Sequence, residues 1–204
     1  MAGTPDENKL QYCAISVADY RATLTLTSTD GANKLGREVI QELLGCMTRL
    51  RALAGEGEIQ RLVISGNKKF FSVGADLNQI AQLTGAKAFE FSRLGQTLML
   101  LIDQFPVPVI AAIRGYCMGG AIDLALACHY RIASPDAVFG HRGASLGLIT
   151  GWGGTQRLPR LIGTARAMQM FMLAEMVNAE EAKKIGLVDE IAEDPAIAAT
   201  NLSK

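Results

Sequence analysis

The chain lacks an excess of charge of either sign. Its 204 residues include 20 lysines and arginines and 20 aspartates and glutamates, so the formal net charge is zero. A chain without a net positive charge has no long-range attraction for nucleic acid or for an anionic membrane surface. We therefore expect neither of these as a partner.

The sequence is also poor in the patterns that bind metals or form disulfides. It has two histidines and four cysteines without CxxC spacing: His129, His141, Cys13, Cys46, Cys117 and Cys128. Zinc sites need such residues in close groups, and a chain of this length can fold without disulfides. We expect no metal ion, and reduced thiols of the kind found in cytoplasmic proteins.

No apolar run is long enough to cross a membrane. The longest runs, residues 98–102 and 107–113, are far shorter than the roughly 20 residues that a spanning helix needs. Residues 1–9 are polar and do not resemble a secretion signal. These features predict a soluble, cytoplasmic protein.

What the sequence does contain is an alternation of strand-like and helix-like segments. Residues 21–28 alternate with a period of two, and together with 11–18 they suit a hairpin that turns at residues 19–20. Helical spacing favours helices over 35–55 and over 86–104, the latter with Phe89 facing inward. Further strands are expected at 60–65, 107–113, 130–133, 137–139 and 187–191, and further helices at 121–128, 155–174 and 178–186. This order predicts a layered α/β fold.

Two glycine-bearing loops follow buried strands. Residues 71–76 come after the strand at 62–65, and residues 115–120 come after the strand at 109–113. Glycine lets a ligand approach the main chain closely, and the first amides of a following helix lack internal partners and favour negative charge. Two such amides aimed at one point would stabilise a carbonyl oxygen that gains charge. Close packing of small residues would give the same pattern without any catalytic role.

Four segments carry a resemblance to the crotonase, or enoyl-CoA hydratase/isomerase, superfamily, and the likeness extends over about residues 23–191. The segments are FFSVGADL at 70–77, PVIAAIRGYCMGG at 108–120, GWGGTQRLPR at 151–160 and AEEAKKIGLV at 179–188. The resemblance implies a crotonase-like (ClpP/crotonase) spiral of ββα units and assembly as a homotrimer or hexamer. It divides the chain into a core domain at 1–191 and a C-terminal tail at 192–204, which has no core-forming pattern. The helices that usually follow the core would then be short or missing.

The resemblance also implies where the chemistry lies. The two oxyanion donors would be the backbone amides of Ala75 and Gly120. Coenzyme A would enter as part of the substrate, with no prosthetic group, and its binding segment would comprise Ser72, Val73, Gly74, Ala75, Asp76 and Leu77. The implied function is an acyl-CoA-binding enzyme of enoyl-CoA hydratase/isomerase type, which stabilises a thioester enolate.

The sequence departs from this family at its acidic positions. Hydratases of the family use two glutamates, whose places are taken here by Asp123 and Gly143, and a third acid position falls near Gly151. Glycine cannot transfer a proton, whereas a nearby histidine, His141, titrates near neutral pH. We hypothesise that Asp123 and His141 act on an acyl-CoA enolate. A loop histidine bonded to backbone and an aspartate in a local salt bridge are the alternatives.

Two other functions stay open from the sequence. The segment Gly115–Gly119 reads G-x-C-x-G, which is similar to the nucleophile elbow of hydrolases and would make Cys117 the nucleophile. A non-catalytic acyl-CoA-binding or scaffold protein would explain the glycines at 143 and 151.

Overall fold

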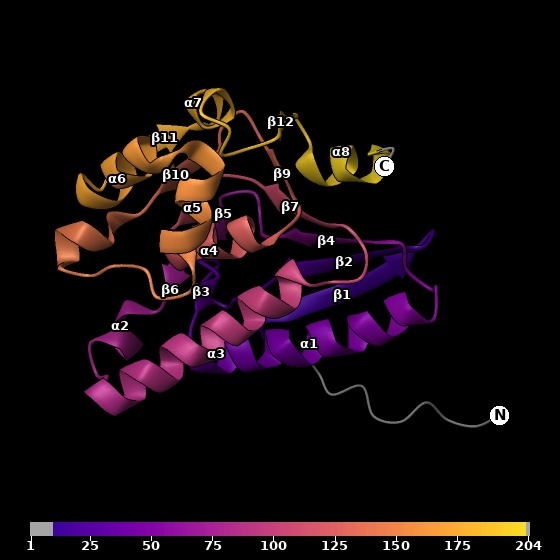
Figure 1. Ribbon diagram of the computed structural model, residues 1–204. Helices are drawn as coiled ribbons and strands as arrows, with labels where there is room; N and C mark the ends of the chain where they lie inside the picture. The colour runs from indigo at the N-terminus through magenta and orange to yellow at the C-terminus, as the bar shows by residue number, and fades with distance from the viewer. Residues whose placement is uncertain (1–9, 203–204) are drawn as a thin grey trace.

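The computed structural model describes residues 10–202, which fold into layered sheets and helices (Figure 1). Within these residues, six strands form the larger sheet in the order β1 (Cys13–Ala18), β2 (Arg21–Leu26), β4 (Arg61–Ser65), β7 (Val109–Ile113), β9 (Tyr130–Ala133) and β12 (Glu190–Ile191). Four more form a smaller sheet in the order β11 (Met176–Asn178), β10 (Val138–Gly140), β8 (Tyr116–Met118) and β5 (Phe70–Ser72). The short strands β3 (Lys34–Leu35) and β6 (Gly74–Ala75) pair with each other.

The connections between these strands repeat. Strands β1 and β2 form the expected antiparallel hairpin, whose turn residues Asp19 and Tyr20 have φ of 50° and 55°. All later neighbours in the larger sheet are parallel, so each needs a crossover. Each of β4, β7 and β9 is followed in the chain by one strand of the smaller sheet, β5, β8 and β10. The chain therefore advances as a spiral of similar turns, and the predicted loop at 115–120 contains the strand β8.

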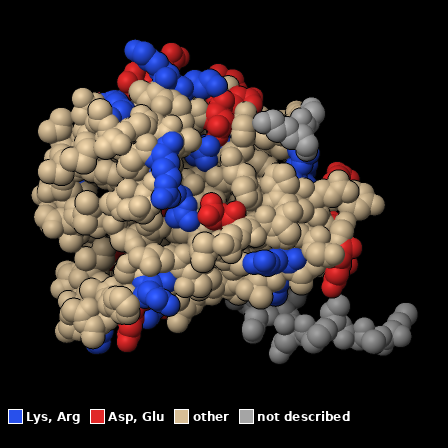
Figure 2. Space-filling model, in the orientation of Figure 1, with Lys and Arg blue, Asp and Glu red and all other residues tan. Residues whose placement is uncertain are grey.

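Acidic and basic side chains are mixed over the surface, in line with the balanced composition. Figure 2 shows both signs scattered over one face, without a broad field of either. Several are paired: Arg166 lies 2.6 Å from Glu175 and 3.4 Å from Glu181, and Arg114 lies 2.9 Å from Asp194. Ion pairs that are partly exposed to solvent, like these, contribute little to stability.

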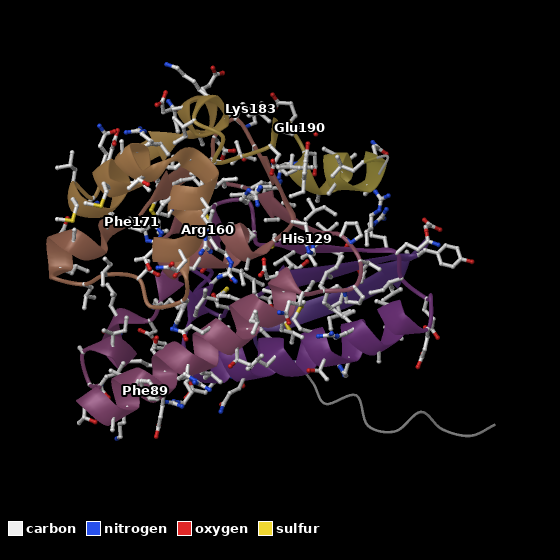
Figure 3. All side chains as sticks on the ribbon, viewed as in Figure 1. Phe89, His129, Arg160, Phe171, Lys183 and Glu190 are labelled. Atoms are coloured by element: carbon white, nitrogen blue, oxygen red, sulfur yellow. The ribbon has the colours of Figure 1, made fainter. Side chains whose placement is uncertain are left out.

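Two long helices, α1 (Arg37–Gly55) and α3 (Gly85–Asp103), pack together along one face of the larger sheet (Figure 1). Their bounds lie close to those predicted, but the inward orientation predicted for Phe89 is wrong. Phe89 is 66% exposed and points away from the core (Figure 3). The buried face of α3 instead contains Phe91, Leu98 and Ile102. Phe89 precedes Phe91 by two residues, which places it on the far side of a helix with about 3.6 residues per turn.

The other helices before residue 185 are shorter. They are α2 (Leu77–Ile80), α4 (Gly120–Ala127), the 3-10 helix η1 (Arg142–Leu146), α5 (Gly154–Ile162), α6 (Thr164–Met172) and α7 (Ala179–Lys184). Two of them, α4 and α7, contact the smaller sheet. Asn178 caps α7, because its side chain accepts the backbone N–H of Glu181 at 2.9 Å. No helix among residues 10–202 is both long enough and apolar enough to span a membrane.

A final helix, α8 (Pro195–Asn201), corrects the expectation that residues 192–204 have no core-forming pattern. It packs on the other face of the larger sheet, where Ala199 is fully buried with Val63 and Ile110. The Arg61 guanidinium donates to the carbonyl of Ala199 at 3.1 Å. An alanine-rich helix has no strongly apolar stripe, so its sequence shows no hydrophobic periodicity. The domain boundary at residue 191 stays a prediction.

Candidate active site

A cavity of about 330 Å³ lies where the two glycine-bearing loops meet. Its walls come from β6 and α2, from α3, from the start of α4 and from the segment 141–152 that includes η1. Ala75 and Gly120 both line it. The structure thus brings together the two residues whose amides the sequence assigns to one carbonyl oxygen.

The backbones of the two loops are in direct contact. A Cβ atom on Gly74 would lie 2.7 Å from the amide nitrogen of Gly120, closer than real Cβ contacts allow. Gly74 also has a φ of +83°, which favours glycine. The N–H of Gly120 begins α4, where it has no intrahelical acceptor, and it donates to no other described residue. This N–H is therefore free to bind a ligand in the cavity.

Trp152 fixes one wall of the cavity. Its indole is 4% exposed and packs against two glycines, one from each of two helices. A Cβ atom would lie 2.6 Å from the indole Cε3 if built on Gly120 and 2.5 Å from Cε2 if built on Gly95. The Phe91 ring meets the indole edge-on, with 5.4 Å between centroids. Trp152 both lines the cavity and holds the start of α4 in place.

Asp123 and His141 form a buried pair beside the cavity. Oδ1 of Asp123 lies 3.6 Å from Nε2 of His141, and neither atom has a hydrogen-bond partner among residues 10–202. The other carboxyl oxygen accepts the hydroxyl of Thr150. These contacts rule out a backbone-bonded role for Nε2 and a Lys or Arg salt bridge for Asp123. His141 and Thr150 line the cavity, whereas Asp123 is 0% exposed and lies behind them.

Burial shifts the two groups in opposite directions. It raises the pKa of Asp123 to about 6, although hydrogen bonds from Thr150 and the Trp152 backbone and the charge of Arg157 oppose this rise. Burial also lowers the pKa of His141 to about 4. Removal from water disfavours the charged form of either group. At pH 7 the pair is therefore a carboxylate next to a neutral imidazole.

The segment predicted to bind coenzyme A is divided between two roles. Val73, Ala75 and Leu77 line the cavity. Ser72 is buried, and its hydroxyl donates to the carbonyl of Asn33 at 2.6 Å and accepts the N–H of Gly74 at 3.0 Å. Asp76 accepts the N–H of Asn78 at 3.0 Å and caps α2. The side chains of Ser72 and Asp76 therefore hold the loop in shape.

Cys117 is poorly placed to act as a nucleophile. It is fully buried on β8, and the cavity is lined by its neighbour Met118 instead. Burial raises the pKa of its thiol well above the usual range, and a thiol that stays protonated is a weak nucleophile. The sequence motif 115–119 is therefore explained by the packing of β8, without hydrolase chemistry.

Thr150 and Arg142 are two residues of the site that sequence reasoning did not assign. Thr150 joins Asp123 to the cavity wall, and Arg142 lines the cavity next to His141. A threonine in an irregular segment has no pattern that marks it. Only the position of Arg142 next to His141 gives a signal in the sequence.

Comparison with known proteins agrees with this fold. A family model described as enoyl-CoA hydratase/isomerase matches residues 21–203. A probable enoyl-CoA hydratase of Bacillus subtilis (strain 168) is 39% identical over 184 residues, which cover 90% of this chain and 70% of that protein. A crotonyl-CoA hydratase of Syntrophomonas wolfei is 38% identical over 171 residues, which cover 83% of this chain and 65% of that protein.

Solved structures give the same result. The crystal structure of an enoyl-CoA hydratase from Bacillus anthracis matches with a TM-score of 0.86 at 33% identity, covering 93% of this chain and 73% of that one. The spiral of parallel strands is thus the crotonase fold. The chain belongs to the enoyl-CoA hydratase/isomerase family, and it spans about two thirds to three quarters of the length of these relatives.

Proposed function

We propose that the chain binds an acyl-coenzyme A thioester and stabilises its enolate through the backbone N–H groups of Ala75 and Gly120. The observation that carries this proposal is that both residues line one cavity, where the Gly74 backbone touches the Gly120 amide. The Gly120 N–H also lies at the positive end of α4. Two fixed donors stabilise charge that develops on a carbonyl oxygen, and one such donor contributes about 3–4 kcal/mol to the transition state.

The proton carrier in this proposal is His141. We assign the proton of the neutral imidazole to Nε2, which lies 3.6 Å from the Asp123 carboxylate, so that the lone pair of Nδ1 accepts a proton. Nδ1 takes the proton from the α-carbon of the thioester, and the electron pair of that bond moves onto the carbonyl oxygen. Returning the proton at the γ-carbon of a 3-enoyl thioester moves its double bond to the α,β position. In the addition of water to a 2-enoyl thioester, Nδ1 instead takes a proton from water while the water oxygen bonds to the β-carbon and the π electrons move onto the carbonyl oxygen. The same proton then goes to the α-carbon as the carbonyl re-forms. Asp123 acts as a positioning residue that stabilises the imidazolium.

The experiment is turnover of a small panel of enoyl-CoA thioesters by the wild type, Asp123→Asn and His141→Gln. Removing a general base costs about 10²–10⁴ in rate, so we expect both variants to lose kcat while still binding the thioester. The pH profile of kcat should also change in Asp123→Asn, which a purely structural role would not cause. Asp136→Asn, an exposed aspartate outside the cavity, is the control. Equal rates for wild type and Asp123→Asn would remove Asp123 from the mechanism.

A non-catalytic acyl-CoA-binding protein is the second candidate. The observation in its favour is that the described residues lining the cavity include no aspartate or glutamate, and that Gly143 and Gly151 stand at the acid positions. Tight binding of thioesters without hydration or isomerisation would support it. Such a result would retain the oxyanion donors as a binding device and exclude His141 as a base.

Assembly as a homotrimer or hexamer, in the cytoplasm, belongs to the same proposal. Its support is the exposure of five apolar side chains on η1, on α6 and on the loops that follow them: Leu146, Ile149, Met168, Met172 and Leu173. Contiguous exposed apolar surface is typical of interfaces. Light scattering on the purified chain tests the assembly, and a monomer at all concentrations would contradict it.

A further inference from the structure

The wall of the cavity contains one permanent cation. Among the described residues that line it, Arg142 is the only lysine or arginine, and acidic residues are absent. Arg142 also forms no ion pair or hydrogen bond with another described side chain, whereas Arg131, Arg157 and Arg166 each have an acidic partner. Arg142 is exposed to solvent where it lines the cavity, and no acidic group among the described residues neutralises its charge.

Arg142 lies in the wall segment that would contact the acyl group of a bound thioester. Arg142 begins η1 directly after His141, and the same segment supplies the apolar residues Leu148 and Ile149 to the wall. At the next position, a Cβ atom on Gly143 would lie 2.8 Å from the Leu148 carbonyl oxygen. A side chain, and therefore an acid, does not fit there without movement. An anionic acyl group would accordingly meet no carboxylate on this wall.

We propose, on the basis of the proposed acyl-CoA function, that the preferred acyl group carries a second carboxylate, which the Arg142 guanidinium binds. A guanidinium pairs with a carboxylate through two parallel hydrogen bonds, a geometry that gives both affinity and selectivity. A cavity of about 330 Å³ is at the small end of ligand sites, so the acyl group is short. The substrate class is thus a short dicarboxylic acyl thioester.

The experiment compares crotonyl-CoA with glutaconyl-CoA, an unsaturated thioester that ends in a carboxylate, by their dissociation constants and by kcat/KM. The wild type should prefer glutaconyl-CoA. Arg142→Gln should weaken its binding by about 10- to 100-fold, the size of one charged hydrogen-bonded pair, and leave crotonyl-CoA unchanged. Arg142→Lys should give an intermediate loss, and Arg160→Gln, a cation outside this cavity, should have no effect.

Each other outcome has a distinct meaning. An equal loss for both thioesters would mean that Arg142 binds a phosphate of coenzyme A, which overturns the proposal. No loss for either would also overturn it. If the wild type bound neither thioester, the acyl-CoA function itself would fail, and this inference would fail with it.

A different part of the molecule carries a second inference. Cys13 on β1 and Cys46 on α1 are both buried, and their sulfur atoms are 3.3 Å apart. Glu42 holds them together, because one of its oxygens accepts the backbone N–H of Cys13 at 3.0 Å and contacts its sulfur at 3.3 Å. The sequence separation of 33 residues gave no sign of this contact.

We propose that Cys13 and Cys46 form an oxidation site at which a peroxide converts the two thiols into a disulfide. The Cys46 thiolate attacks one peroxide oxygen, the O–O bond breaks and a sulfenic acid forms as hydroxide leaves. The Cys13 sulfur then attacks the sulfur of Cys46, its proton joins the departing hydroxide, and water is released. Two thiols and one hydrogen peroxide thus give one disulfide and two water molecules.

The surroundings favour this step. The hydrogen bond from Cys13 and the charge of Arg49 lower the pKa of Cys46, although burial and the Glu42 carboxylate oppose this shift, and a lower pKa favours the reactive thiolate. The sulfur atoms need to approach by only about 1.3 Å to reach the disulfide length of about 2.05 Å. Strand β1 lies at the edge of its sheet, where local opening gives the oxidant access.

The test is peroxide treatment of the folded protein, followed by alkylation and mass spectrometry of its peptides. We expect a cross-link between the peptides that contain Cys13 and Cys46, with a mass two hydrogens below the sum of the free thiols, and a higher Tm. Cys46→Ser should abolish the cross-link, and Cys128→Ser should not. A cross-link that involves Cys117 or Cys128, or four thiols that all stay free, would overturn the proposal.

Discussion

Replacing Gly120 with alanine tests how closely the oxyanion donor depends on its packing. The added Cβ would lie 2.6 Å from Cε3 of Trp152 and closer still to Cζ3. The indole has no room to retreat, because Gly95 and Phe91 enclose its other edge. The start of α4 must therefore shift, and the amide of residue 120 shifts with it.

Two effects of different size follow from this clash. Overpacking of a close-packed site costs about 1–3 kcal/mol of unfolding free energy. Misplacing one oxyanion donor costs about 10²–10³ in kcat. Both are measurable, by urea unfolding and by turnover of an enoyl-CoA substrate. Trp152→Phe in the same chain removes part of the indole and should restore part of the lost rate.

The matched control is Gly45→Ala on α1, where a Cβ atom would meet no atom of the described part of the chain within 4 Å. It should leave kcat unchanged and raise stability by about 0.5–1 kcal/mol, the difference between alanine and glycine inside a helix. If Gly120→Ala folds and keeps the wild-type kcat, the Gly120 amide is not a catalytic donor.

Three further predictions concern the buried groups. Because burial raises the pKa of Asp123 from 3.8 to about 6 and lowers that of His141 from 6.5 to about 4, their effects on stability oppose each other between pH 4 and 6. The free energy of unfolding of His141→Gln, which retains only Asp123, should fall as the pH rises through this range, and that of Asp123→Asn should rise. Each change should be about 3 kcal/mol in urea unfolding. Unfolding free energies that change with pH in the same direction in both variants would contradict this. Gly154→Ala places a Cβ atom 3.1 Å from the Asp123 carboxyl carbon and overlapping Oδ1, so it should lower kcat, and a wild-type kcat in this variant would separate Asp123 from catalysis. Cys117→Ala should keep the wild-type kcat/KM, whereas a large loss would support Cys117 as the nucleophile of a hydrolase.

Much of the fold follows from local patterns in the sequence. The hairpin at Asp19-Tyr20 and the helices α1 and α3 have strong periodicity, and the structure has them close to the predicted positions. The orientation of α3 could not be predicted from its sequence, because its apolar residues do not by themselves show which side faces the core. Phe89 is apolar and yet 66% exposed. The sequence does not predict the helix α8, because small residues such as Ala199 are buried without forming a periodic pattern of apolar residues.

The candidate site likewise has some features that the sequence predicts and others that only the tertiary structure shows. The positions of Ala75 and Gly120 follow from glycine loops at strand ends and from the family resemblance, and both residues line the cavity. The distance between Asp123 and His141 depends instead on how α4 packs against the segment after β10, which tertiary structure decides. The same holds for the contact between Cys13 and Cys46, two residues on different elements.

The most direct measurement is the infrared spectrum of a thioester bound to the protein, with ¹³C at the carbonyl carbon so that its band can be isolated. If two amides polarise the carbonyl, its band moves to lower wavenumber on binding, and Gly120→Ala moves it back toward the value in solution. A bound thioester whose carbonyl band equals that of the free compound would contradict the role given to Ala75 and Gly120.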